Sequence, residues 1–196
     1  MRPIRWVLFV AGLSVILSPS LCFADMGIPM LFIGFPMILL CLIPIIAIET
    51  IVFNDKLRTN YVKTLKAVGL ANVITTIIGY PFSWALLLGL QLLTRGNSSV
   101  FGTETLWRKV ASVTLGAAWL SPSENDQYWM VPVAGMIGLI PAFFISVYLE
   151  YFVVLQFFYE NKKDLLPLSW KANLITYILL IGFLFWSLFS RFFSNL

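Results

Sequence analysis

The chain has 196 residues, of which 60% are hydrophobic and 11% charged, and its formal net charge is +4. Soluble domains contain roughly 25% charged residues, so this composition excludes an ordinary soluble domain and indicates a membrane protein. The sequence has no histidine, which excludes Ser-His-Asp and Cys-His catalysis and histidine-ligated haem or zinc.

Residues 1–24 have the pattern of a bacterial signal peptide. Two arginines, Arg2 and Arg5, precede a short apolar run from Trp6 to Leu17. The sequence Cys22-Phe23-Ala24 then offers a cleavage site before Asp25. The alternative is an uncleaved first membrane helix, which leaves the topology of the rest of the chain unchanged.

Four apolar segments follow, each close to the ~20 residues that a transmembrane helix needs. They are expected to run from Ile28 to Phe53, from Ala67 to Leu93, from Met130 to Tyr159 and from Ala172 to Phe189. Seven basic residues lie in the short loops after the first and third spans, against four in the other segments of the mature chain. The positive-inside rule therefore places the loops 54–66 and 160–171 in the cytoplasm and both mature termini in the periplasm of a bacterial inner membrane.

The segment 94–129 is the one sizeable part expected outside the membrane, and it predicts a periplasmic amphipathic helix. Its apolar residues recur at helical spacing. They are Leu106, Val110, Val113, Ala117 and Leu120. Thr103 is the expected N-cap. Two placements remain open: the helix lies on the membrane–water interface, or it packs on the ends of the spans.

An offset of 101 residues aligns the two halves of the chain and indicates an internal repeat. Glu49 then matches Glu150, and Asn72 matches Asn173. Glutamate and asparagine are uncommon in membrane spans, so these matches are informative. The expected fold is all-α: a four-helix bundle of two tandem parallel-repeat hairpins, 25–93 and 130–196, on either side of the segment 94–129.

The repeat predicts one polar cluster, because equivalent residues of parallel hairpins lie at the same membrane depth. Its members are Glu49, Asn72, Thr75, Glu150, Asn173 and Thr176. Each glutamate is expected to accept a hydrogen bond from an asparagine amide or a threonine hydroxyl. Two interpretations remain: hydrogen bonds that tie the helices together, or an ion or proton site.

The first hairpin resembles a poorly characterised group of bacterial polytopic membrane proteins. The similarity rests on the sequence from Pro44 to Glu49, the basic loop, and Ala71-Asn72 with Thr75-Thr76 and Gly79. The same glutamate–loop–asparagine pattern is distantly similar to the filament-integrity membrane proteins of filamentous cyanobacteria. That resemblance implies a membrane scaffold or a component of septal junctions between cells.

These observations favour a non-enzymatic inner-membrane scaffold or accessory subunit at the cell envelope or at cell–cell junctions. Its expected partners are the lipid bilayer and other membrane proteins or a second copy of the chain. We expect no catalytic residue, cofactor or metal site, and no nucleic-acid partner, because the basic residues are dispersed between apolar blocks. The alternative is a small ion- or proton-coupled transporter or channel that uses Glu49 and Glu150.

Overall fold

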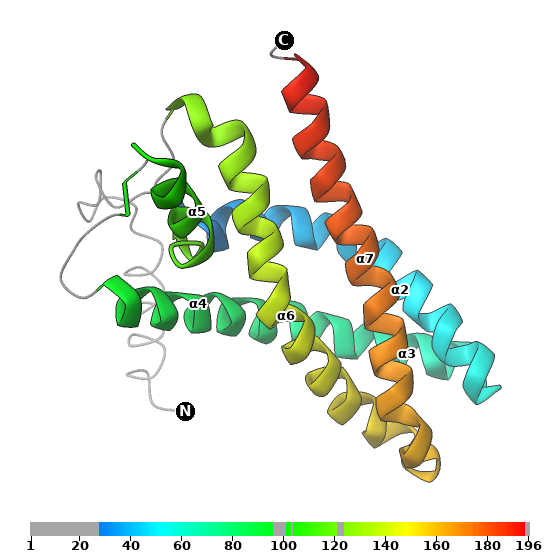
Figure 1. The fold of residues 1–196 in the computed structure, drawn as a ribbon. Coiled ribbons are helices and arrows are strands. Elements are labelled where there is room, and N and C mark those ends of the chain that lie inside the picture. The colour runs from blue at the N-terminus through cyan, green and yellow to red at the C-terminus, as the bar shows by residue number, and fades with distance from the viewer. Residues whose placement is uncertain (1–27, 96–100, 103, 121–123, 195–196) are drawn as a thin grey trace, which may run out of the picture.

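The protein is an all-α membrane protein with four helices that are long and apolar enough to cross a membrane (Figure 1). The computed structural model describes residues 28–95, 101–102, 104–120 and 124–194, so the expected signal peptide lies outside the described residues. The candidate spans are Met30–Leu57, Tyr61–Thr94, Gln127–Phe157 and Tyr159–Ser190. The prediction of a four-span bundle is confirmed.

The second and fourth spans belong to helices that begin earlier than expected. Helix α2 (Met30–Leu57) is followed by α3 (Tyr61–Ile74). Asn60 caps α3, because its Oδ1 accepts a hydrogen bond from the backbone N–H of Val62 at 2.9 Å. Helix α7 (Lys162–Ser194) likewise starts well before Ala172, directly after the 3₁₀ turn η3 (Tyr159–Asn161). The expected starts at Ala67 and Ala172 were wrong because hydropathy marks the apolar part of a helix, whereas its polar first turns extend beyond that part.

The second span contains a π-helical turn in its middle. Helix α3 runs through η1 (Thr75–Gly79) into α4 (Tyr80–Arg95), and the backbone N–H of Tyr80 bonds to the carbonyl of Thr75. Pro81 follows at once and has no N–H to donate, so regular helical bonding is interrupted at this place. Turns of this type are frequent at functional sites.

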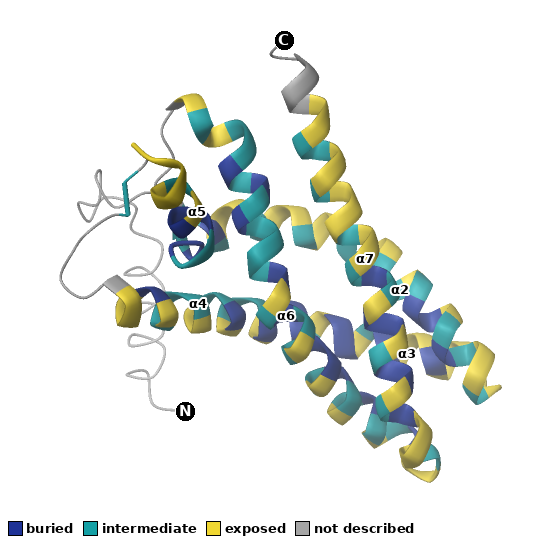
Figure 2. Cartoon of the chain, viewed as in Figure 1, coloured by how far each residue is buried: buried dark blue, intermediate teal, exposed yellow. Residues whose placement is uncertain are grey.

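Helices α2, α3, α6 (Gln127–Phe157) and α7 pack tightly at the end of the bundle that carries the two hairpin connections, here called the hairpin end. The buried core there consists of Phe53, Ala67, Val68, Ala71, Val154, Phe158, Leu165, Leu168 and Ala172. Figure 2 shows buried residues where α3, α6 and α7 cross. This apolar packing fills the bundle between the polar cluster and the hairpin connections.

The connection between the hairpins forms a small cap at the opposite end. Helix α5 (Leu106–Thr114) is capped by Thr105, whose hydroxyl accepts from the Arg108 N–H at 3.3 Å. The strand β2 (Trp119–Leu120) pairs antiparallel with β1 (Ile28–Pro29), and the 3₁₀ turn η2 (Glu124–Asp126) leads into α6. The expected helix through Leu120 was therefore too long, and Thr103, its expected cap, lies outside the described residues.

Helix α5 packs on the ends of the spans. Its Val113 belongs to a buried cluster with Ala117, Leu120, Met30, Met130 and Ala134. The indole N–H of Trp84 on α4 donates to the carbonyl of Ala118 at 2.7 Å, and this bond holds the cap to the second span. Leu106 and Trp107 stay on the outside and are 78% and 76% exposed.

The bundle is open near the cap. Figure 1 shows α4 and α7 leaving the crossing region in different directions. An apolar cavity of about 210 Å³ lies between α2, α6 and α7 there, and we call it the cap-end cavity. Its wall includes Ile33, Gly34, Met37, Gly135 and Phe183.

Candidate functional site

The predicted polar cluster lies inside the bundle, with one glutamate on each of the first and third spans and an asparagine and a threonine on each of the second and fourth. Glu49 on α2 and Glu150 on α6 lie eight and seven residues before the ends of their helices. Asn72 and Asn173 each lie eleven residues after the start of α3 and α7. At a rise of ~1.5 Å per residue these positions share one depth, about 10–17 Å from the helix termini. All four residues are at most 5% exposed.

Each hairpin makes the same pair of hydrogen bonds. Asn72 Nδ2 donates to Glu49 Oε2 at 2.7 Å and to the carbonyl of Val68 at 3.1 Å. Asn173 Nδ2 donates to Glu150 Oε2 at 2.5 Å and to the carbonyl of Ser169 at 3.1 Å. The two asparagines therefore orient the two glutamates by equivalent contacts, each spanning 23 residues of sequence.

The two hairpins are joined at this cluster. Thr176 of the second hairpin donates to Glu49 Oε1 of the first at 2.9 Å. The side chains of Glu49 and Glu150 also line one central cavity. Thr75 and Thr176 both donate to the carbonyl four residues earlier, that of Ala71 at 2.9 Å and that of Ala172 at 3.3 Å. Thr176 also lies 3.1 Å from the Asn173 carbonyl, so five of the six predicted residues are linked, and the sixth, Thr75, borders the central cavity.

A central cavity of about 50 Å³ adjoins the cluster. Thr76, Ser146, Tyr80 and Tyr177 line it together with the glutamates and asparagines. The hydroxyls of Ser146 and Tyr177 are 2.8 Å apart, and the Tyr80 hydroxyl donates to the Met30 carbonyl at 3.2 Å. A space of this size exceeds what one water molecule needs.

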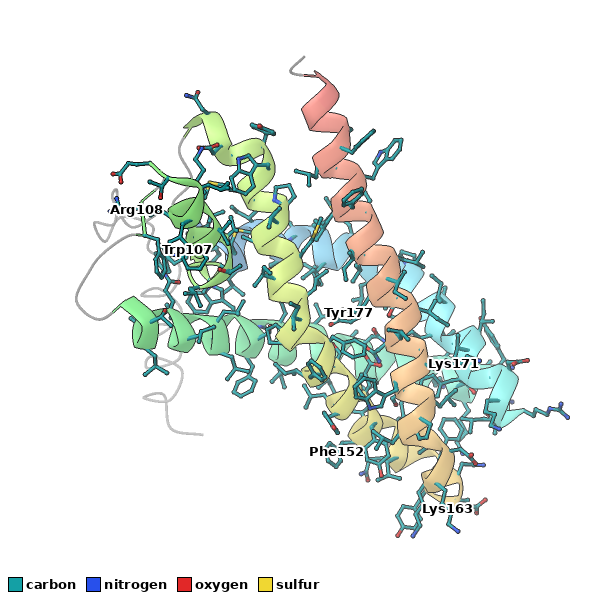
Figure 3. All side chains as sticks on the ribbon, viewed as in Figure 1. Trp107, Arg108, Phe152, Lys163, Lys171 and Tyr177 are labelled. Atoms are coloured by element: carbon teal, nitrogen blue, oxygen red, sulfur yellow. The ribbon has the colours of Figure 1, made fainter. Side chains whose placement is uncertain are left out.

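Sequence reasoning did not include Tyr80 and Tyr177 in the cluster. Figure 3 labels Tyr177 in the interior of the bundle, away from Trp107 and Arg108 in the cap. Helical spacing would have found both tyrosines. Tyr177 follows Asn173 by four residues, and Tyr80 follows Asn72 by eight, so each shares a helix face with its asparagine.

The chemistry of the cluster is that of oxygen ligands and neutral donors. Among the residues that the structure describes, no group of three His, Cys, Asp or Glu side chains could hold a metal ion. The buried Oδ1 of Asn173 has no hydrogen-bond partner. The arrangement can tie helices together through hydrogen bonds, and it presents carboxyl and amide oxygens to the central cavity.

Comparisons with known proteins found no relative with which this site could be compared. The equivalent Glu–Asn contacts of the two hairpins are thus the main guide to the role of the cluster. No protein-family model, curated protein or solved structure matches the chain.

Proposed function

We propose that the chain is a non-enzymatic scaffold or accessory subunit of the bacterial inner membrane and acts by packing against other membrane proteins or a second copy of itself. The observation that carries this proposal is the cap-end cavity of about 210 Å³ between α2, α6 and α7. Membrane helices associate through close van der Waals contact. An apolar opening of this size is therefore a place where a partner helix gains contacts.

Helix α2 supplies the exposed wall of this opening. Its buried residues are Met30 at one end and Glu49, Thr50 and Phe53 at the other. Between them, the described part of this chain buries no residue of α2. The long middle of a membrane helix is thus left for lipid or for a partner, and the cavity beside it favours a partner.

Two glycines line the opening, and the place of a Cβ at Gly34 is taken by the Tyr80 hydroxyl. Gly34 on α2 and Gly135 on α6 both line the cap-end cavity. Small residues let a neighbouring helix approach closely. The resemblance of the first hairpin to filament-integrity proteins supports a partner at the cell envelope or at a junction between cells.

Site-specific photo-crosslinking in native membranes tests the scaffold. A photoreactive residue at Met37, which is 42% exposed and lines the cavity, is expected to yield one discrete protein adduct. The same residue at Ile178, which is 59% exposed, is the control on a surface outside the cavity and is expected to capture lipid.

A cavity-filling variant completes this test. A Cβ at Gly135 would meet Leu184 at 3.6 Å, an ordinary contact, so Gly135→Phe can extend into the cavity. The variant is expected to abolish the Met37 adduct while leaving the chain folded. Lipid adducts alone at both positions, or an adduct that Gly135→Phe leaves unchanged, would contradict the proposal.

We further propose that the hairpin end faces the cytoplasm and the cap faces the periplasm, as the distribution of basic residues predicts. Lys63→Cys and Trp107→Cys, each in a chain without Cys22 and Cys41, test this topology. A membrane-impermeant thiol reagent is expected to label position 107 in intact cells with an opened outer membrane. Position 63 should react only after the inner membrane is permeabilised. Labelling of both positions from one side would refute the assignment.

A further inference from the structure

The polar cluster contains two acids and no base. The side chains of Glu49 and Glu150 both line the central cavity. Their hydrogen bonds come from Asn72, Asn173 and Thr176, which are neutral donors. No lysine or arginine is present among the described residues that line the central cavity. Two adjacent carboxylates in so buried a place cannot both stay ionised without a positive charge from outside the chain.

A second observation points to a ligand in the same place. Asn173 is 1% exposed and lines the central cavity, yet its Oδ1 has no partner. The orientation of this amide follows from its contacts, because Nδ2 donates to both Glu150 and the Ser169 carbonyl, which accept. Its Oδ1 is therefore a buried acceptor that lacks a donor or a cation, and buried acceptors are rarely left so.

The size and chemistry of the space restrict what can fill it. The central cavity is about 50 Å³, whereas Mg²⁺ usually keeps several of its waters and needs more room. Carboxyl, amide and hydroxyl oxygens suit hard cations and protons rather than transition metals. The other titratable groups that face the cavity are Tyr80 and Tyr177, which supply hydroxyls.

We propose that the central cavity binds one exchangeable monovalent cation between Glu49 and Glu150, either Na⁺ with Asn173 Oδ1 as a further oxygen ligand or a proton on the carboxyl pair. Either cation reduces the charge of the carboxyl pair, and Na⁺ also satisfies the unpartnered acceptor. The central cavity shares Ile38, Tyr80, Leu139 and Leu180 with the cap-end cavity. This binding site does not depend on the scaffold role.

Two measurements on the purified full-length chain in nanodiscs test the proposal. The first is equilibrium binding of ²²Na⁺, with unlabelled NaCl as competitor. The second is infrared detection of a protonated carboxylic acid whose band shifts in D₂O. Saturable binding of one Na⁺ per chain identifies Na⁺ as the ligand, whereas the infrared band without Na⁺ binding identifies the proton. Absence of both signals overturns the proposal without any variant.

Amide variants then assign the signal to this site. Glu49→Gln and Glu150→Gln keep acceptors for the asparagine bonds, and each is expected to lose the Na⁺ binding or the carboxylic-acid band. Asp164→Asn is the matched control, because Asp164 is an exposed acid on α7 outside the cavity, and it should leave the signal unchanged. A signal that survives in the double variant Glu49→Gln/Glu150→Gln also overturns the proposal.

Discussion

Replacing Asn173 with leucine is expected to lower the free energy of unfolding by about 1–3 kcal/mol. Asn173 Nδ2 donates to Glu150 at 2.5 Å, and Glu150 is 3% exposed. Leucine has a similar volume but no donor, so it leaves a buried carboxyl group short of one hydrogen bond. Reversible unfolding in mixed detergent micelles, followed by loss of helical signal or by steric trapping, measures this change.

Two comparison variants isolate the hydrogen bond. Leu174→Ala removes the neighbouring side chain, which is 52% exposed, and its cost should stay within about 0.5 kcal/mol. Glu150→Gln retains an acceptor for Asn173 and should cost less than Asn173→Leu. If Asn173→Leu proves as mild as Leu174→Ala, the contact does not hold the bundle together.

Replacing Gly79 with leucine is expected to destabilise the bundle by about 1–3 kcal/mol and to separate the second span from α6. Gly79 is the last residue of the π-helical turn η1 and is buried against α6. A Cβ at this position would lie 3.1 Å from Ile145 Cγ2 and 3.4 Å from Leu149 Cδ1. The further atoms of leucine have no free space there, so the two helices must move apart.

Gly89→Leu is the control for this substitution. Gly89 lies on the same span, and a Cβ there meets nothing within 4 Å. Leucine at this position is expected to leave the free energy of unfolding almost unchanged, or to raise it slightly because glycine disfavours helix. Equal destabilisation by both substitutions would show that close packing at Gly79 has no special role.

The polar cluster also joins the two hairpins to each other. Asn72 and Asn173 act within their own hairpins, whereas the bond from Thr176 to Glu49 joins the two hairpins. The Ser83 hydroxyl adds a bond to the Gly138 carbonyl at 3.2 Å, which joins α4 to α6 nearer the cap. The same groups that would hold a cation are therefore those that hold the two halves together, so loss of the cation is expected to loosen the hairpin pair.

The sequence alone was enough to predict the four spans and the pairing of Glu49 with Asn72 and of Glu150 with Asn173. The reason is that a membrane span must satisfy its backbone internally as a helix, and buried acids need local donors. The repeated separation of 23 residues places each asparagine opposite its glutamate in a hairpin. Helix termini were predicted less well, because capping side chains such as Asn60 act outside the apolar pattern.

Only the tertiary structure decided how the two hairpins meet. The pairing of Thr176 with Glu49 links residues 127 positions apart. This bond breaks the symmetry that equal sequences suggest, because Thr75 and Thr176 otherwise donate to equivalent carbonyls. In the cap, helix α5 ends at Thr114, and the chain continues to the strand that contains Leu120. Leu120 is buried there because it pairs with β1 and packs against the ends of the spans. Local sequence patterns specify which residues are apolar enough to be buried and which polar residues need a hydrogen bond. The packing of separate helices determines which contact or hydrogen-bond partner each of these residues has.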